Sequence, residues 1–421
     1  MDTPRGYARV DLRRDRASEV LDVDSWGFAF TPPAGERETL AGAFEFDRGR
    51  GIEITDAYRG AVGSLVAVHT SIPHAMRVPG GGTVATSGLT WVAVHPGHRR
   101  RGLMSTMVDD HVERSLSRGE PVSTLFAAES QIYQRFGYGN ACPALSLDLG
   151  RRPAMRELAG ARDLRLTLDS ADLDTHIGAI RTVQQRIQRP GTMVEFSDVT
   201  ARDLFIDLES ERDDAEQLRI AIVEDDDGPA AFALFRRKGE DDEHFGKGTT
   251  TVRTWGAAHA SAQQRLFTVL SDLDLMAKTK VFSVPPDDPL LSLLVNMGAT
   301  KPHMGDNLWL RILDVPAALE ARRYARDCTV GIEVADPLLP ENTHIWTLSI
   351  VDGQASVTRA ERGVSAHVRL GIQELSAAYL GGVTMASLAR AGLVDEVRLG
   401  AVDLLSDAMR GDQLPVGNIS F

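Results

Sequence analysis

Short apolar runs alternate with segments of helical periodicity near the start of the chain, a pattern typical of layered α/β domains. Four apolar runs predict strands, at 52–54, 63–68, 89–94 and 122–127. The run 89–94 is apolar without interruption, which indicates a central strand buried on both faces. Residues 76–79 and the glycines that follow predict a turn into a further strand. A helix is expected over 102–116, where apolar residues recur with helical spacing before Gly119, and a shorter one within 129–138.

The same order of strand, loop, helix and strand recurs between residues 151 and 300, so a second α/β unit is predicted there. Its strands are expected at 218–223, 230–235, 250–255 and 281–284. Its helix is expected over 261–276. The loop 256–261 lacks the arginines that occupy the matching loop of the first unit. A strand at 308–313 is expected to close this second unit.

A third unit is predicted from residue 305 to residue 421. Asp314 and Pro316 are typical of a helix start, and the helix that they open is expected over 317–324. Strands are predicted at 331–334, 345–350 and 366–370, and helices at 372–380 and 385–391. Chain ends are commonly disordered. This one nevertheless carries apolar residues that favour a docked tail: Leu414, Val416, Ile419 and Phe421.

The loop of the first unit carries the clearest candidate chemistry. After the strand 89–94 the sequence runs His-Pro-Gly-His and then Arg99, Arg100, Arg101 and Gly102 before the helix begins. Helix N-termini have unpaired amides and the positive end of the helix dipole, so they attract anions. Arginines add charge-assisted donors, and glycine lets the backbone approach a phosphate closely. The loop is therefore interpreted as a phosphate site; the alternative is an ordinary solvated basic helix start.

Composition narrows the function classes. The 421 residues are 43% hydrophobic and have a net charge of −13. This acidic balance argues against general nucleic-acid binding, which needs a basic face. It is compatible with a cationic substrate, although acidic surfaces often serve solubility alone. Two cysteines without metal-type spacing, no apolar run long enough to span a bilayer and no visible secretory signal favour a cytoplasmic location.

Two further clusters have both a metal-binding and a structural interpretation. Asp225 to Asp227 with Gly228 could hold a metal, but Asp-Gly is typical of a hairpin turn, which is the favoured interpretation. His95 and His98 could serve as metal ligands or as a general base. The neighbouring arginines disfavour a cation, and His-Pro is typical of turn structure. No metal is therefore predicted.

The arginine loop resembles the signature of the GCN5-related N-acetyltransferase (GNAT) superfamily, Arg/Gln-x-x-Gly-x-Gly/Ala. Arg99 and Gly102 match it, while Met104 departs from the small third residue. A closer resemblance, to the enhanced intracellular survival (Eis) family of acetyltransferases, covers nearly the whole chain. Four features carry it: Phe/Trp-Val-Ala-Val-x-Pro-x-His-Arg-Arg-Arg-Gly-Leu at 91–103, Ile-Tyr-x-Arg-Phe-Gly-Tyr-Gly at 132–139, Leu-Trp-Leu-Arg-Ile-x-Asp-Val-Pro-Ala-Ala-Leu-Glu-Ala-Arg at 308–322, and a terminal phenylalanine.

The resemblance implies an α/β (α+β) fold class, with tandem GCN5-related acetyltransferase folds followed by a sterol-carrier-protein-like domain. An acetyl-CoA-binding domain would span 1–150 and a degenerate second acetyltransferase-like domain 151–304. The sterol-carrier-like domain would span 305–421, with a C-terminal tail that reaches the active site. The resemblance also implies a homohexamer. The arginine-free second loop agrees with a degenerate second copy.

The resemblance also assigns coenzyme-binding roles. Backbone groups of Val92, Ala93 and Val94 would pair with the pantetheine arm of acetyl-CoA, and the Val94 amide could polarise the thioester carbonyl. Five consecutive residues would surround the pyrophosphate: Arg99, Arg100, Arg101, Gly102 and Leu103. Trp26 and Phe28 are candidates for a wall of the acceptor pocket; the alternative is that they are ordinary core residues.

Two catalytic roles follow from the same resemblance. Tyr133 matches the general acid that protonates the departing thiolate; the alternative is an aromatic residue that packs a short helix. A phenol with a pKa near ~10 is protonated at neutral pH and can donate to a thiolate. Tyr138 is assigned to structure. The Phe421 carboxylate would assist deprotonation of the amine; since a free α-carboxyl has a pKa near ~3.5, it would work through water, through a raised pKa, or as an electrostatic anchor.

The leading hypothesis is direct transfer of acetyl from acetyl-CoA to primary amines. Aminoglycosides are the implied substrates, acetylated at one or several amines, which would give antibiotic resistance. Lysine side chains and polyamines are alternative acceptors. A second hypothesis is a binding module, in which the third unit carries an apolar ligand and the coenzyme site senses acyl-CoA.

Overall fold

The computed structural model describes residues 3–240, 246–361 and 363–421. The first α/β unit contributes β1 (Tyr7–Asp11), α1 (Ala17–Phe28), α2 (Arg37–Ala41), β2 (Arg50–Ile54), β3 (Leu65–Arg77), β4 (Thr83–Val94), α3 (Leu103–Ser117), β5 (Val122–Leu125), α4 (Gln131–Gln134) and β6 (Gly139–Gly150). The next segment contributes β7 (Arg165–Ser170), α5 (Leu173–Arg186), β8 (Met193–Phe196), α6 (Asp198–Phe205), β9 (Arg219–Asp225), β10 (Gly228–Lys238), β11 (Gly248–Ala257), α7 (Ala260–Leu270), β12 (Met276–Val284), α8 (Pro289–Leu293) and β13 (His303–Ile312). The last contributes α9 (Val315–Ala321), β14 (Cys328–Ala335), β15 (Ile345–Val351), β16 (Gln354–Arg359), β17 (Val368–Gly371), α10 (Ile372–Ala378), α11 (Met385–Arg390), β18 (Val394–Glu396) and α12 (Ala401–Met409).

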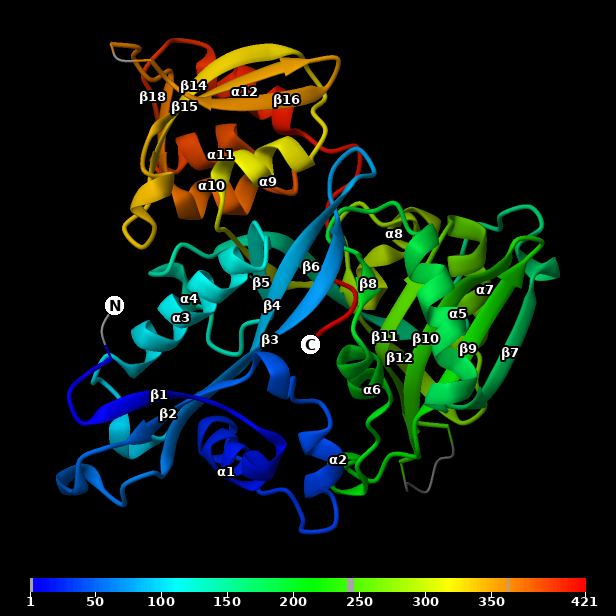
Figure 1. Ribbon diagram of the computed structural model, residues 1–421. Coiled ribbons are helices and arrows are strands. Elements are labelled where there is room, and N and C mark those ends of the chain that lie inside the picture. Colours follow the sequence, from blue (N-terminus) through cyan, green and yellow to red (C-terminus); the bar gives the residue numbers. More distant parts are fainter. Residues whose placement is uncertain (1–2, 241–245, 362) are drawn as a thin grey trace.

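These strands form two sheets (Figure 1). The large sheet has 13 strands in the order β1-β2-β3-β4-β5-β13-β6-β12-β11-β10-β9-β7, and β8 pairs with β3 outside this path. The small sheet has five strands in the order β16-β15-β14-β17-β18 and belongs to the C-terminal unit. Helices pack on the faces of both sheets, so the chain buries its apolar runs in α/β layers.

The two α/β units exchange strands at the centre of the large sheet. β13 lies between β5 and β6 and runs antiparallel to both. β6 also pairs with β12 of the second unit. The strand predicted at 308–313 therefore forms, but the prediction that it closes the second unit is wrong, because it completes the sheet beside β5. The exchange joins the two units through continuous ladders of backbone hydrogen bonds.

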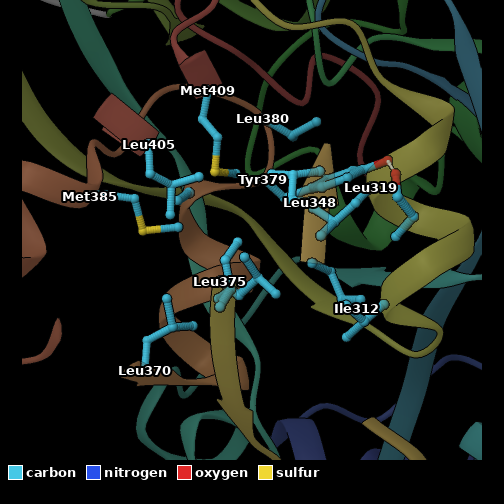
Figure 2. Close-up of a cluster of buried hydrophobic side chains, with 14 of the residues drawn as sticks. Ile312, Leu319, Leu348, Leu370, Leu375, Tyr379, Leu380, Met385, Leu405 and Met409 are labelled. Carbon is cyan, nitrogen blue, oxygen red and sulfur yellow. Dashed lines mark hydrogen bonds between the residues drawn. The ribbon is translucent and has the colours of Figure 1, made fainter. Parts of the chain in front are cut away.

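The C-terminal unit packs directly on the large sheet. Ile312 of β13 shares one buried cluster with Leu319 of α9, Leu375 of α10 and Leu405 of α12 (Figure 2). The α10 backbone lies so close to β6 that a Cβ added at Gly139 would be 2.6 Å from the backbone nitrogen of Ala377. The position of this unit is therefore set by a shared apolar core, which also determines where the chain end can reach.

Most predicted elements form, with altered bounds. The expected strand 63–68 and part of the segment 76–79 are one long strand, β3, which a glycine turn joins to β4. The helix expected over 261–276 ends at Leu270, and Met276 already begins β12. The helices α1, α5 and α12 have no predicted counterpart. Most of the stability of such helices comes from packing their apolar faces against the rest of the fold, which the sequence alone does not show.

The acidic cluster at 225–227 forms the turn of the β9–β10 hairpin, as predicted, with Asp225 opposite Gly228. Asp225 accepts hydrogen bonds from Arg186 and His259, and the bond from Arg186 holds the pKa of this carboxyl well below its usual range. Across the described residues, no group of acidic, histidine or cysteine side chains is arranged to hold a metal ion. In the same ranges, every helix is too short or too polar to cross a membrane.

Candidate active site

β4 and β5 are neighbours only over a short stretch. Pairing joins 86–88 of β4 to 122–124 of β5, although β4 continues to Val94. Beyond Gly88 the strands separate, and within the described strands nothing pairs with this edge of β4. On its other edge, the His95 N–H donates to the Val66 carbonyl at 2.8 Å. Because backbone groups alternate between the two edges of an antiparallel strand, the N–H and C=O of Val94 point into the split.

Side chains on this stretch of β4 anchor it from both faces. Val92 and Val94 pack in the cluster that includes Leu103, at the start of α3. Ala93 faces α1 closely: a Cβ added at Gly27 would lie 2.9 Å from the Cβ of Ala93. With both faces covered, the backbone edge of 92–94 is the part of β4 left open to a ligand.

A tight loop leads from β4 into α3. Arg100 has φ +59° and Gly102 has φ +83°, so the backbone turns twice through the left-handed region before the helix begins. No side chain caps the start of α3, and no acidic residue lies in its first turn. The first-turn amides and the positive end of the helix dipole are therefore available to an anion.

The three arginines of the loop are exposed, and among the described residues none of them forms an ion pair. Arg99 Nε donates to the Val94 carbonyl at 3.4 Å, at the end of the split. Arg101 Nη1 donates to the Tyr7 hydroxyl at 2.9 Å. Unpaired cations around an uncapped helix start form a site with the charge and donors that a pyrophosphate requires.

The loop histidines hold its shape. His95 Nδ1 accepts from the Gly97 N–H at 3.2 Å, and His98 Nδ1 accepts from the Tyr7 hydroxyl at 2.9 Å. Both contacts agree with the turn interpretation. The Trp26 ring at the end of α1 lies 5.2 Å from that of His95, centroid to centroid.

Trp26 is 61% exposed and Phe28 is 50% exposed. Neither residue belongs to the core, so the core alternative stated for them is wrong. Large exposed aromatic side chains are available for contact with a ligand. Here they end the helix that packs on the open part of β4.

Tyr133 lies over the split. Its ring joins the buried cluster that contains Leu89 of β4 and Leu125 of β5, the residues at which the strands part. Its hydroxyl has no hydrogen-bond partner among the described residues. Burial raises the pKa of this phenol to about 12, and the nearby Glu129 carboxylate adds to the rise. The hydroxyl is therefore protonated at neutral pH and free to donate.

Tyr138 lies beside Tyr133, with ring centroids 5.9 Å apart, but it is fully buried. Its hydroxyl hydrogen-bonds Ser123 Oγ at 2.8 Å, and Ser123 in turn bonds His111 Nε2 at 2.7 Å. Burial raises the pKa of Tyr138 above its usual range. This satisfied internal network fits a structural role for Tyr138.

Phe421, the last residue, lies at the base of the same split. Its ring covers Gly88 so closely that a Cβ added there would be 2.5 Å from Cε2 of that ring. The ring also contacts His74 of β3 and Phe126, which follows β5, at centroid distances of 4.6 and 5.3 Å. The chain end thus docks over β4 at Gly88, the point where β4 and β5 separate, with β3 and the segment after β5 on either side.

Tyr133 and Phe421 lie on opposite faces of the sheet. Side chains of successive strand residues point to opposite faces. Leu89 faces the cluster that contains Tyr133, and the preceding residue, Gly88, faces Phe421. A group held in the split would have the phenol on one side and the chain end on the other.

The seat of Phe421 was not predicted from the sequence. His74 is buried, with Nε2 bonded to Thr200 Oγ1 at 3.1 Å, and burial lowers its pKa to about 3, so the ring is neutral. Phe126 and His74 belong to no motif. Gly88 carries the one signal that was available, since a glycine inside an apolar strand indicates a close approach of other atoms.

Comparison with known proteins assigns this architecture. The chain matches an acetyltransferase (GNAT) domain over residues 11–141, a second acetyltransferase (GNAT) domain over 201–312 and a sterol carrier protein domain over 315–416. The N-acetyltransferase Eis of Mycobacterium tuberculosis is 31% identical over 325 residues, which cover 75% of this chain and 76% of that protein. The chain belongs to the Eis family of N-acetyltransferases. It is thus an acetyl-CoA-dependent N-acetyltransferase, with tandem GNAT folds and a sterol-carrier-like unit as predicted.

Other Eis-family and GNAT proteins extend the likeness over nearly the full length. An uncharacterized N-acetyltransferase of Streptomyces coelicolor is 33% identical over 402 residues, covering 93% of this chain and 95% of that one. The crystal structure of Eis1 from Mycobacterium abscessus is 26% identical and has a TM-score of 0.80, covering 99% of this chain and all of that chain. A GCN5-related N-acetyltransferase from Anabaena variabilis, 20% identical with a TM-score of 0.80, shares the fold.

Acetyl-CoA fits the residues of this Eis-family chain. The uncapped start of α3 and the unpaired arginines match the charge of its pyrophosphate, and the open edge of 92–94 offers backbone groups to a chain of amides such as pantetheine. When bound, acetyl-CoA supplies an activated acetyl thioester. The candidate coenzyme residues thus lie together around one split.

The second unit differs at the matching place. A cavity of about 300 Å³ adjoins the loop between β11 and α7. Two basic side chains that line it are already paired: His259 with Asp225 at 3.0 Å, and Arg189 with Asp287 at 2.6 Å. His259 also caps α7. Among the described residues that line this cavity, no arginine or lysine is left unpaired for a pyrophosphate.

Asp24 on α1 is a buried acid near the active site and predicts a pH effect on stability. It is 6% exposed, its Oδ1 has no partner, and burial raises its pKa to about 7. The unfolded value is near ~3.9. The folded state therefore binds more protons between these two values, so stability falls as pH rises through this window.

Asp24→Asn is expected to stabilise the protein at pH 8, by about 1–2 kcal/mol, and hardly at pH 4, as measured by thermal melting. The control is Asp22→Asn on the exposed face of α1; a gain for Asp24→Asn that does not change with pH would contradict the prediction.

Proposed function

We propose that this enzyme transfers acetyl from acetyl-CoA to primary amines of aminoglycosides, at one or several positions. In this proposal the coenzyme is held by Val92 to Val94 and by 99–103. Tyr133 acts as general acid, and the carboxylate of Phe421 assists deprotonation of the amine. Trp26 and Phe28 form part of the acceptor wall.

One observation carries the proposal. The open backbone edge of β4, an unbonded phenol and the chain end converge on a single strand split. These are the three groups that acetyl transfer to an amine needs: donors for the thioester oxygen, a proton source for the leaving sulfur, and an anion for the incoming ammonium.

Within this proposal each residue performs one step. The Phe421 carboxylate takes a proton from the substrate ammonium through a water molecule, which leaves the amine nitrogen free to form the new C–N bond. The Val94 N–H donates to the carbonyl oxygen as negative charge develops on it. Tyr133 gives its phenolic proton to the sulfur as the C–S bond breaks, the new amide nitrogen releases its remaining extra proton to water, and solvent later restores the phenolic proton. The phenol and the carboxylate work from opposite faces, so the two proton transfers do not compete.

Charge and exposed aromatics support a polycationic acceptor. The net charge of −13 attracts cations over long range. Trp26 and Phe28 offer exposed ring faces, on which sugars and ammonium groups can stack. An assay of CoA release with aminoglycosides, polyamines and a lysine peptide tests the class. The proposal expects the highest kcat/KM with aminoglycosides. A higher kcat/KM with the lysine peptide or with polyamines would contradict the aminoglycoside assignment and favour that other class of acceptor.

Tyr133→Phe is expected to lower kcat by about 100-fold, because general acids contribute 10²–10⁴-fold. The dissociation constant of acetyl-CoA should change less than about threefold, since the phenol donates mainly as the bond to sulfur breaks. Thiol release measures the first quantity and titration calorimetry the second.

Tyr138→Phe is the matched control for Tyr133→Phe. It removes the same atom from the neighbouring ring and leaves Ser123 with one partner fewer. We expect lower thermal stability with kcat within about threefold of the parent. Equal turnover of Tyr133→Phe and the parent would return Tyr133 to a packing role.

The family resemblance also supports assembly into six subunits and a cytoplasmic location. Light scattering coupled to size exclusion tests the assembly, for which six copies of the 45.8 kDa chain are expected. A monomer or dimer at assay concentrations would exclude it.

A further inference from the structure

The last residues of the chain cross the second α/β unit before they reach the active site. Val416 N–H donates to the Pro190 carbonyl at 2.9 Å. The backbone of Gly417 makes two hydrogen bonds with the side chain of Asn307, at 2.7 and 3.0 Å. Ile419 is fully buried in the core of the second unit. The tail is therefore bound along its length rather than only at Phe421.

Asn418 makes the densest set of contacts in the tail. Its carbonyl accepts from Thr254 Oγ1 at 2.6 Å, and its Nδ2 donates to the Trp255 carbonyl at 3.2 Å. Its amide also forms a reciprocal pair with the side chain of Gln184, with Nδ2 to Oε1 at 2.7 Å and Nε2 to Oδ1 at 3.2 Å. The Asn418 side chain is thus held by α5 and β11 together.

The place where Asn418 binds is a second strand split. β11 and β12 pair in parallel only from 248 to 251 on β11, and then separate while β11 continues to Ala257. β11 also carries a bulge at Arg253, as β4 does at 91–92. Thr254 and Trp255 lie just beyond this point. They hold the position on β11 that the open edge 92–94 holds on β4.

The sheet brings the two splits toward one another. β8 of the second unit pairs with β3 of the first, outside the main path of the sheet, so the two units are also joined beside the tail. Gln184, which binds Asn418, also donates to the carbonyl of Met193 on β8. Phe421 lies three positions after Asn418, and an extended chain covers at most ~10–11 Å over that length. A fixed Asn418 therefore restricts Phe421 to a small volume at the first split.

We infer that residues 416–419 are a built-in occupant of the second split, and that Asn418 is a positioning residue for the carboxylate of Phe421. The second unit then has a function: it holds the chain end where the first unit holds acetyl-CoA. This inference rests on the proposed role of the Phe421 carboxylate. It goes further in assigning the degenerate unit and one amide side chain to that role.

Asn418→Ala in the full-length enzyme tests the inference. We expect kcat to fall about 10-fold while the KM for acetyl-CoA stays within twofold, since Asn418 lies away from the arginine loop. Thr254→Val removes one tail contact at nearly constant volume and should give a smaller loss of the same kind. Gln413→Ala, in the same tail but without a side-chain hydrogen bond among the described residues, is the control and should keep the parent kcat.

A combination with a C-terminal extension separates positioning from general stability. If an added Gly-Gly already displaces the carboxylate, Asn418→Ala in the extended enzyme should cause no further loss of kcat. Full additivity of the two losses, or an unchanged kcat for Asn418→Ala alone, would overturn the inference.

Carboxypeptidase digestion tests the seat without using activity. The parent should retain Phe421, whereas Asn418→Ala should release it at least several-fold faster. Equal release rates would also overturn the inference. If the extension alone proves harmless while release rates still differ, the proposed role of the carboxylate fails and the seat in the second split stands.

Discussion

Adding two glycines after Phe421 is expected to lower kcat by about 100-fold, the lower range of general-base contributions. The Phe421 ring fills the space over Gly88 and touches His74 and Phe126. An extension replaces the terminal carboxylate by a neutral amide and moves the charge away from the split. The dissociation constant of acetyl-CoA should remain within about twofold, because the arginine loop is untouched. Steady-state CoA release and calorimetry provide the two measurements.

The same two glycines at the N-terminus serve as the matched control for this extension and should leave kcat unchanged. Gly88→Ala offers an independent route to the same effect. Its new Cβ would lie 2.5 Å from the Phe421 ring, so the ring has to move while the carboxylate keeps its charge. We expect a loss of kcat between those of the control and the extension. Full activity of the extended enzyme would show that the Phe421 carboxylate takes no part in deprotonating the amine.

The arrangement of the candidate coenzyme residues could be predicted from sequence because its determinants are local. A strand, a loop with Arg99 to Arg101 and an amphipathic helix follow one another directly, and neighbouring backbone geometry decides the site. Even here the family resemblance was needed to specify the coenzyme. Trp26 shows the limit of local reasoning, since its exposed position beside His95 depends on how α1 crosses β4.

Long-range pairing could not be read from the same patterns. The run 308–313 has the apolar content of a buried strand, but nothing in it selects β5 and β6 as partners. Register and partner choice depend on the assembled core. The position of the chain end depends in turn on β13, because Gly417 is held by Asn307. The position of the chain end, a candidate catalytic group, therefore required the tertiary structure.

In the proposed mechanism the three units contribute different parts to one reaction centre. The first supplies the split, the arginine loop and Tyr133; the second binds the tail; the third supplies the tail and rests on the sheet through a shared core. A change that loosens the third unit should therefore affect the active site from a distance. The ion pair between Arg311 of β13 and Asp336 of the third unit, called the joint below, allows this distant effect to be tested.

Asp336→Ala is expected to destabilise the protein by about 3–5 kcal/mol, because it leaves a buried arginine without its counter-charge. Arg311 of β13 and Asp336, which follows β14, are both fully buried, and Arg311 Nη2 donates to both carboxylate oxygens at 2.7 Å. The carboxylate also accepts from the backbone N–H groups of Leu338 and Leu339 and from Asn342 Nδ2. Thermal and urea melting measure the loss.

The control for Asp336→Ala is Asp407→Ala, which removes an equal charge from the half-exposed pair with Arg326 and should cost less than about 1 kcal/mol. The double replacement Arg311→Met with Asp336→Leu should recover part of the stability lost by Asp336→Ala, since the uncompensated buried charge is gone. If the joint also sets the path of the tail, Asp336→Ala should lower kcat at temperatures well below its melting transition while the double variant regains it. Equal melting temperatures for Asp336→Ala and Asp407→Ala would show that the third unit is held by its apolar core alone.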